Sequence, residues 1–393
     1  MLNAQDRAIV KATVPLLESG GEALTTHFYK MLLKDYPQVR PLFNQAHQDS
    51  GAQPRALANG ILMYARHIDQ LEQLGDLVAQ IINKHVALQI LPEHYPLVGT
   101  CLLRSISQVL GSEIATPEVI GAWGRAYQQL ADILIGAEKS MYDEKEQAPG
   151  GWRGPREFKV AAKVRESAEI SSFYFSPADG KPILDFIAGQ YIGMQLFLDG
   201  EEIRRNYSLS ALGGNNQYRI SVKREPGGRA SNYLHDKLHV GDRINLFTPA
   251  GDFTLAHNDK PLVLISGGVG ITPTLAMLEA ALSTARPIYF IHCARNGAVH
   301  AFRDWIEGQV AEHPQLKRFY CYNEDDGVSP AADAIGLLDQ ARLEQWLPEN
   351  RDLDAYFLGP KGFMVAIKRQ LKIAGVPEKQ SRFEFFGPAS VLE

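Results

Sequence analysis

The sequence is poor in cysteine and carries no excess of positive charge. Three cysteines, Cys101, Cys293 and Cys321, are scattered over 393 residues. A scattered, odd number of cysteines argues against a disulfide framework and against a cysteine metal site, and it fits a reducing compartment. The formal net charge is -5, and the sequence shows no basic stripe. We therefore expect no nucleic-acid partner.

Long apolar runs are also missing from the sequence. No uninterrupted apolar segment is long enough to cross a bilayer, so we expect no stable membrane insertion. Residues 1–7 lack the basic start and the apolar stretch of a signal peptide, which favours a cytoplasmic location. Hydrophobic residues make up 45% of the chain and charged residues 22%. This is an ordinary globular composition, and the length suits two or three domains.

The hydrophobic pattern changes twice along the chain and predicts a multidomain protein. Residues 1–142 show helical periodicity with short breaks, which predicts an all-α domain. Residues 143–157 are charged and then rich in Gly and Pro, as in a linker. Residues 158–259 hold short β-like runs between turns, which predict a small antiparallel β-barrel. In residues 260–393 strands and helices alternate, which predicts an α/β domain with a parallel sheet.

The helical domain contains a histidine on an apolar helix face. Val78, Ile82 and His85 recur at three- and four-residue steps, so His85 points into an apolar surface. A histidine in this position is either an ordinary core residue or an axial iron ligand, and the pattern alone favours the core residue. Tyr29 also looks inward, and Gln53 stands at the head of another apolar stripe.

Two motifs in the remaining domains suggest nucleotide binding. The apolar run 261–266 leads into a Gly-rich turn at 267–273 that opens a helix. Backbone N–H groups at such a turn can bind a phosphate, although a structural tight turn explains the pattern equally well. On a predicted barrel strand, Arg205 can pair with a diphosphate and Tyr207 can stack on a planar cofactor; an ordinary exposed strand is the alternative.

The order of the motifs is more informative than each motif alone. Arg205-x-Tyr207-Ser208, Gly268-Val269-Gly270-x-Thr272-Pro273, Gly359-Pro360 and a terminal Phe-Gly-Pro follow one another. This order resembles the ferredoxin-reductase-like flavoproteins, from the predicted β-barrel to the end of the chain. With the N-terminal helical domain, the whole chain resembles the flavohaemoglobins. The resemblance implies a globin domain with haem b, a barrel with FAD and an α/β domain with NAD(P)H.

The resemblance also implies roles for residues of the helical domain. His85 is implied as the proximal haem ligand, and Phe43 as a contact of the porphyrin. Tyr29 and Gln53 are implied on the distal side, where they can donate hydrogen bonds to dioxygen. Tyr95 and Glu138 are implied to hold the other ring nitrogen of His85, which makes the imidazole more basic. A helix cap for Glu138 and simple packing for Tyr95 are the alternatives.

In the reductase half the resemblance implies three sets of residues. The FAD set is Tyr191, Arg205, Asn206, Tyr207, Ser208, Phe385, Phe386, Gly387 and Pro388. The NAD(P)H set is Gly268, Val269, Gly270, Ile271, Thr272 and Pro273. Lys84 and Glu384 are implied to tune the haem and flavin potentials, although Lys84 could be an ordinary surface charge.

Three positions bear on the nicotinamide site. Leu358 and Phe385 stand where relatives often carry cysteine, so the sequence does not define the nicotinamide pocket. Arg295 follows a strand where a base could meet a 2′-phosphate, or it is an ordinary loop arginine. We favour NADH.

The function implied by the resemblance is that of a nitric oxide dioxygenase. NAD(P)H would reduce FAD, FAD would reduce the haem iron, and ferrous haem would convert NO and O2 to nitrate. A lipid or alkyl hydroperoxide reductase is the alternative enzyme, and a haem-based oxygen or redox sensor is the alternative from another class. Expected partners are NO, O2, NAD(P)H and a lipid in the distal haem pocket, and we expect a monomer.

Overall fold

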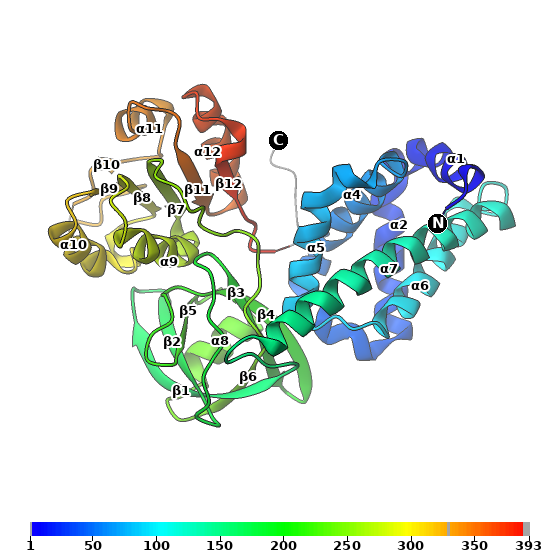
Figure 1. Cartoon of the computed structure of the whole chain (residues 1–393), viewed down its shortest axis with the longest axis horizontal. Coiled ribbons are helices and arrows are strands. Elements are labelled where there is room, and N and C mark those ends of the chain that lie inside the picture. Colours follow the sequence, from blue (N-terminus) through cyan, green and yellow to red (C-terminus); the bar gives the residue numbers. More distant parts are fainter. Residues whose placement is uncertain (1, 328–330, 388–393) are drawn as a thin grey trace. The chain divides into compact units, whose positions relative to one another are not determined.

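The structure is a computed structural model that describes residues 2–327 and 331–387. The described residues form two compact units. The first unit holds residues 2–154, together with 195–205 and Gly387, and the second holds most of the rest. Figure 1 labels the elements of each unit along the chain.

The N-terminal part of the first unit is helical, as predicted. Its elements are α1 (Ala4–Ala12), α2 (Val14–Asp35), η1 (Pro37–Leu42), α3 (Gln45–Asp49), α4 (Ala52–Arg66), η2 (Leu71–Leu74), α5 (Gly75–Leu88), α6 (His94–Leu110) and α7 (Pro117–Gln147). Helix α2 begins at Val14, and Pro15 suits its first turn. A side chain built at Gly21 would lie 3.5 Å from Ala58, an ordinary contact distance, so α2 and α4 pack closely here without requiring glycine.

The start of α7 is well defined. Pro117 begins the helix, and the Thr116 hydroxyl accepts a hydrogen bond from the Val119 N–H. The helix continues through Gln147, so residues 143–147 of the predicted linker are helical. A pure helical periodicity does not reveal this extension, because its last turns are charged. The domain boundaries themselves stay predictions.

An antiparallel sheet follows the helices. Its strands are β1 (Arg156–Arg165), β2 (Ile170–Pro177), β3 (Tyr191–Leu198), β4 (Glu201–Ser208), β5 (Tyr218–Lys223) and β6 (Arg243–Leu246), in the order β4-β3-β6-β1-β2-β5. A bridge between Leu209 and Ile220 joins the chain leaving β4 to β5, the two ends of this order. Helix α8 (Arg229–Asp236), which the sequence pattern did not predict, ends where Lys163 donates hydrogen bonds to three backbone carbonyls.

The C-terminal part is a parallel α/β sheet. Its strands β7 (Leu262–Gly267), β8 (Ile288–Ala294), β9 (Leu316–Tyr322), β10 (Ala334–Ile335), β11 (Asp354–Leu358) and β12 (Ser381–Phe383) have the order β10-β9-β8-β7-β11-β12. The helical elements are η3 (Gly268–Gly270), α9 (Ile271–Leu282), η4 (Gly297–Val299), α10 (Arg303–Glu312), α11 (Gln340–Trp346), α12 (Lys361–Ile373) and η5 (Glu378–Gln380). Strand β7 is buried along its whole length, which explains its continuous apolar sequence.

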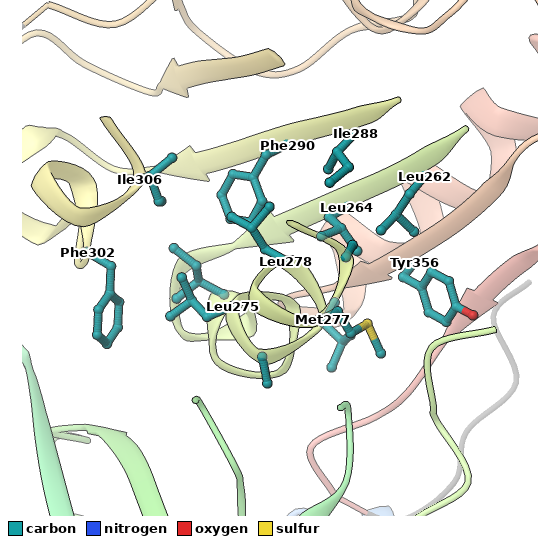
Figure 2. Close-up of a cluster of buried hydrophobic side chains, with 14 of the residues drawn as sticks. Leu262, Leu264, Leu275, Met277, Leu278, Ile288, Phe290, Phe302, Ile306 and Tyr356 are labelled. Carbon is teal, nitrogen blue, oxygen red and sulfur yellow. The ribbon is translucent and has the colours of Figure 1, made fainter. Parts of the chain in front are cut away.

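One core of this sheet lies on the side of α9, and another lies on the side of α11 and α12. Figure 2 shows Leu275 and Leu278 of α9 among side chains of β7 and β8, including Leu264 and Phe290. Each large apolar side chain in such a core contributes about 1.5–3 kcal/mol through burial. The tight packing fixes α9 against the strand that precedes it, and therefore fixes the turn between them.

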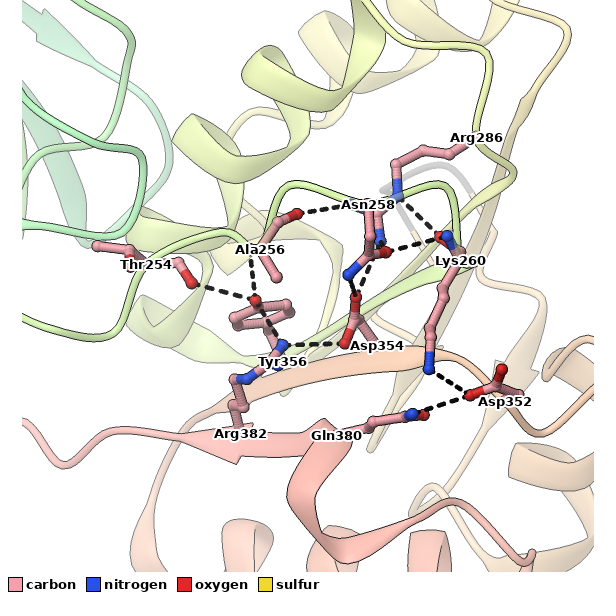
Figure 3. Close-up of polar contacts among 10 residues, drawn as sticks. All are labelled: Thr254, Ala256, Asn258, Lys260, Arg286, Asp352, Asp354, Tyr356, Gln380 and Arg382. Carbon is pink, nitrogen blue, oxygen red and sulfur yellow. Dashed lines mark hydrogen bonds and ion pairs between the residues drawn. The ribbon is translucent and has the colours of Figure 1, made fainter. Parts of the chain in front are cut away.

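A polar network pins the amino-terminal edge of the same sheet. Arg286 and Asp354 are both almost fully buried and form an ion pair at 3.3 Å. Figure 3 shows that Asp354 also accepts hydrogen bonds from Asn258 and Arg382, and that Arg382 donates to the Tyr356 hydroxyl. These contacts hold the short strand β12 against β11. They thereby fix the start of the C-terminal segment that follows it.

Among the described residues, no helix is both long enough and apolar enough to span a bilayer.

Candidate functional site

Three helices bring His85, Tyr95 and Glu138 together. His85 Nδ1 lies 2.7 Å from Glu138 Oε1 on α7 and 3.2 Å from the Tyr95 hydroxyl on α6. The Tyr95 hydroxyl donates to the same Glu138 oxygen at 2.6 Å. Because a carboxylate accepts hydrogen bonds, Nδ1 carries the proton, and the lone pair of the neutral ring is on Nε2. The arrangement therefore prepares Nε2 of His85 as a metal ligand.

The partners of this cluster are held by the helices themselves. The Glu138 side chain is only 2% exposed. Tyr127 on α7 donates to the Tyr95 carbonyl at 2.6 Å, and a side chain at Gly99 would meet the Tyr127 ring at 2.5 Å. Only glycine at position 99 lets this ring lie against α6. Sequence reasoning missed Gly99, because its role depends on a ring one helix away.

A second polar group lies on α2 and α4. The Gln53 side-chain amide donates to the Tyr29 hydroxyl at 3.3 Å, and the Phe43 ring meets the Tyr29 ring edge-on at 5.5 Å between centroids. Burial raises the pKa of Tyr29 to about 12, so its hydroxyl stays protonated at neutral pH. Since Gln53 supplies a hydrogen, the hydroxyl hydrogen of Tyr29 can be donated to a ligand.

Several apolar residues of the helical domain are incompletely covered. Phe43, Leu57, Ile61, Val78 and Val98 pack against the helical core but remain half-buried. The His85 side chain is 31% exposed, although its Nδ1 partners are buried. Half-covered apolar side chains in the helical domain that carries this prepared imidazole fit a flat, largely apolar group that binds iron. The residues present therefore fit haem.

The hairpin of β3 and β4 places most of the predicted FAD residues at one end. The Leu209 N–H donates to the Gln190 carbonyl at 3.0 Å, so the end of β4 lies beside the start of β3. Tyr191 begins β3, and Ser208 ends β4. A side chain at Gly251 would meet the Tyr191 ring at 2.8 Å, so this position requires glycine. Asn206 is exposed, and Tyr207 and Arg205 are half-buried on β4.

The C-terminal segment carries the other predicted FAD residues. The Phe385 ring contacts the Phe383 ring edge-on at 5.7 Å, whereas Phe386 is 48% exposed. Burial raises the pKa of Tyr191 well above its ordinary value, and the Glu384 carboxylate raises it further. Glu384 thus lies within electrostatic range of Tyr191. The half-buried Tyr207, the exposed Phe386 and the polar groups of β4 fit a planar cofactor with a diphosphate. Pro388 lies outside the described residues.

The Gly-rich turn is built for close backbone approach. Gly268 has φ +55°, in the left-handed region, and it begins η3 between β7 and α9. A side chain at Gly270 would lie 2.5 Å from the Leu358 carbonyl oxygen of β11. The sheet order reverses between β7 and β11; β7 ends in Gly267, and Gly359 directly follows β11. A reversal of this kind marks the nucleotide crevice of open α/β sheets.

The remaining residues of the turn have structural contacts. The Thr272 hydroxyl donates to the Val269 carbonyl at 3.1 Å. Ile271, Thr272 and Pro273 are buried. These residues shape the first turn of α9, whose backbone N–H groups face the crevice edge of the sheet.

Family profiles match three parts of the chain. A globin profile matches residues 26–134, an oxidoreductase FAD-binding domain profile matches 157–255, and an oxidoreductase NAD-binding domain profile matches 264–369. Flavohemoproteins of Pseudomonas putida and Pseudomonas aeruginosa are 74% and 65% identical to the chain, and each match covers all of both sequences. The chain belongs to the flavohemoprotein family.

Solved structures agree with this family. A flavohemoglobin of Malassezia yamatoensis with bound FAD and haem has a TM-score of 0.88 and 27% identity, and the match covers 98% of this chain and all of that one. The FAD/NAD-binding domain of a nitric oxide dioxygenase from Vibrio cholerae is 35% identical, with a TM-score of 0.55, over 60% of this chain and all of that one. The globin, FAD-binding and NAD-binding domains predicted from the sequence are confirmed.

Two features of this flavohemoprotein were not predicted from its sequence. The Phe363 ring of α12 packs against Gly267 at the end of β7 and against Gly359 just after β11. Side chains built at these two glycines would meet the ring at 3.2 and 2.6 Å. The spacing Gly359-Pro360-x-x-Phe363 is the available signal. Arg295 forms an ion pair with Glu169 at 2.5 Å. The two residues are 126 positions apart, and no local pattern connects them.

The predicted tuning residues have separate surroundings. Lys84 Nζ donates to the Gly387 carbonyl at 2.6 Å within the first unit. The Lys84 side chain is therefore not simply a solvated surface charge. Its proposed influence on a redox potential stays a prediction, as does that of Glu384.

Proposed function

We propose that this flavohemoprotein is a nitric oxide dioxygenase that uses NAD(P)H. The observation that carries the proposal is the cluster of His85, Tyr95 and Glu138. The description of the Vibrio cholerae neighbour as a nitric oxide dioxygenase supports it. When bound, haem supplies the iron at which O2 and NO combine, and FAD divides the two electrons of a nicotinamide hydride into single-electron steps.

On one side of the haem, His85 would hold the iron through Nε2. Glu138 and Tyr95 fix the ring orientation and keep the proton on Nδ1, because both act on that atom. A carboxylate partner increases the basicity of the imidazole. The more basic ligand favours electron donation toward the iron, which suits oxygen chemistry better than reversible oxygen storage.

On the other side, Tyr29 and Gln53 would act on the substrate. The protonated Tyr29 hydroxyl can donate a hydrogen bond to O2, and Gln53 orients it. Phe43 restricts the Tyr29 ring through its edge-on contact. These residues would slow the escape of O2 until NO arrives.

In the reductase half, we assign residues to the FAD site and to the NAD(P)H site from the strand ends near which they lie. Arg205, Asn206, Tyr207 and Ser208 would bind FAD with Tyr191, Phe385, Phe386, Gly387 and Pro388. Residues 268–273 would bind the diphosphate of NAD(P)H at the first turn of α9. We retain 1–142, 143–157, 158–259 and 260–393 as the globin domain, linker, FAD domain and NAD(P)H domain.

The Arg295–Glu169 ion pair favours NADH as the coenzyme. Arg295 follows β8, where the adenosine ribose of a coenzyme would lie. Its guanidinium is paired with Glu169, so a 2′-phosphate would have to displace a carboxylate. Glu169→Gln should therefore lower the KM for NADPH several-fold and leave the KM for NADH almost unchanged. Equal KM values for NADPH in wild type and variant would remove Glu169 from this role.

Replacing Glu138 tests the proposed role of the cluster. Glu138→Gln should raise the haem reduction potential and lower NO consumption by about ten- to a hundredfold, as for other partners of metal-bound histidine. Glu118→Gln, an exposed position on the same helix, is the matched control. An unchanged potential in the Glu138 variant would contradict the role.

A hydroperoxide reductase is the second candidate, because a carboxylate-paired histidine also suits peroxide cleavage. Steady-state turnover with NO and with an alkyl hydroperoxide, under the same NADH supply, separates the two. We expect faster turnover with NO.

A further inference from the structure

Cys293 and Cys321 stand side by side in the parallel sheet of the second unit. The register of β8 and β9 pairs Cys293 directly with Cys321. Directly paired residues of neighbouring strands point to the same face, and both cysteines belong to the core on the α11 and α12 side. Their positions in the chain give no reason to pair them, because 27 other residues separate them.

The spacing of the two strands permits a covalent link. Neighbouring strands lie about 4.8 Å apart. Disulfides usually join residues whose Cα atoms are about 4.4–6.8 Å apart. Parallel side-chain directions leave the two Cβ atoms slightly farther apart than a relaxed disulfide prefers, so a bond here would be easily reduced.

The surroundings favour a thiolate at one of the two sulfurs. One contact opposes ionisation, because the Cys321 thiol donates to the Gly336 carbonyl at 3.2 Å, but other groups act in the opposite direction. A hydrogen bond from the Cys293 thiol lowers the pKa of Cys321, and the Arg342 guanidinium lowers it further against the effect of burial. Arg342 is itself anchored by a hydrogen bond to the Leu337 carbonyl at 2.8 Å. Thiolates, and not thiols, react with oxidants.

We propose that Cys293 and Cys321 form a reversible dithiol–disulfide site that reacts with hydroperoxides. In the first step, the thiolate attacks the O–O bond of the hydroperoxide, which yields a sulfenic acid and releases an alcohol, or water from hydrogen peroxide. In the second step, the other thiol attacks this sulfur, and water leaves. The two thiols lose two electrons and two protons, which the peroxide takes up. Cys321 is itself buried, so the oxidant must reach its sulfur past the partly buried Cys293.

Cys101 provides an internal control in the globin domain. It is fully buried, and burial raises the pKa of its thiol. A buried thiol whose pKa is raised stays protonated and is inert, whereas the pKa of the similarly buried Cys321 is lowered. We therefore expect oxidation to remove the thiols of Cys293 and Cys321 and to leave the thiol of Cys101.

Thiol counting on the full-length protein, loaded with its cofactors, tests the proposal. After brief exposure to hydrogen peroxide, we expect two of the three thiols to be lost and one peptide pair to be linked through Cys293 and Cys321. Dithiothreitol should restore both thiols. Cys101→Ser should leave this loss of two thiols unchanged, and Cys321→Ser should abolish the linked peptides. Loss of one thiol, linkage between two chains, or survival of all three would overturn the proposal.

A second measurement needs no variant. Phenylarsine oxide binds only two neighbouring thiols, so it should protect Cys293 and Cys321 of the wild-type protein from later alkylation. Alkylation of both residues at the unprotected rate would also overturn the proposal. Both tests read thiols directly and do not depend on the proposed dioxygenase activity.

Discussion

Burial determines what the tyrosines of the helical domain can do. Tyr29 and Tyr64 are both buried, and burial raises the pKa of each to about 12. Their partners differ: Gln53 donates to the Tyr29 hydroxyl, whereas the Tyr64 hydroxyl donates to the Ala126 carbonyl. Tyr64 has therefore used its hydrogen within the fold, and Tyr29 can offer its hydrogen to a ligand.

Removing the Tyr29 hydroxyl should weaken O2 binding. We expect Tyr29→Phe to raise the O2 dissociation rate by about tenfold, the equivalent of one hydrogen bond of about 1.4 kcal/mol. Tyr64→Phe is the matched control and should leave the rate unchanged while lowering stability slightly. Stopped-flow measurement of O2 release checks both, and equal rates in wild type and Tyr29→Phe would refute the role.

The raised pKa of Tyr29 also predicts a pH profile. The hydroxyl donates only while it is protonated, and its pKa of about 12 lies above the ordinary value of 10.0. The donor is therefore retained as pH rises through the ordinary value and is lost only as pH approaches the raised one. The O2 dissociation rate should stay level from neutral pH to about pH 10. A rate that climbs with a midpoint near the ordinary value would contradict this burial argument.

At the scale of elements, the strand ends determine the coenzyme site. The turn from β7 into α9 approaches the end of β11 so closely that Gly270 has no space for a side chain. We expect Gly270→Ala to raise the KM for NADH at least tenfold, because the new methyl group would meet backbone atoms that cannot rotate away. Gly308→Ala, on α10 with open space around it, is the control and should leave the KM unchanged. Steady-state kinetics with an artificial electron acceptor provide the KM values.

The network at the opposite edge of that sheet predicts a stability difference between two aspartates. Asp354 is 1% exposed and binds Arg286 and Arg382, whereas Asp352 is exposed and binds Lys260 and Gln380. Asp354→Asn should lower the free energy of unfolding by about 3–5 kcal/mol, because it leaves a buried arginine without its counter-charge. Asp352→Asn should cost about 1 kcal/mol or less. Thermal unfolding of the reductase half, followed by flavin release, compares them; equal midpoints would argue against the network.

At the scale of the whole molecule, regular patterns predicted the domains. The helical periodicity, the short strands and the strand–helix alternation each reflect a repeating geometry, so the three fold types could be predicted from the sequence. The motif order then suggested the family. Helix α8 was missed because it is short and is stabilised by a distant partner, Lys163.

The sequence suggested some residues of the candidate sites, but it did not reveal the contacts between them. His85, Tyr29 and Gln53 could be suggested because each occupies a periodic helix position. Their contacts could not be predicted, because the partners come from other helices. The Arg295–Glu169 pair and the Cys293–Cys321 pair depend on the tertiary fold alone. A single sequence identifies the chemical groups, and the packing of elements determines which groups meet.

We propose that one chain passes electrons from NADH to a haem at which NO is oxidised. The most direct measurement follows NO, NADH and nitrate together in air-saturated buffer with protein whose spectrum shows bound haem and flavin. We expect one nitrate for each NO consumed and half as many NADH, because a hydride carries two electrons. Protein with both cofactors bound that oxidises NADH without consuming NO, or that yields no nitrate, would contradict the account.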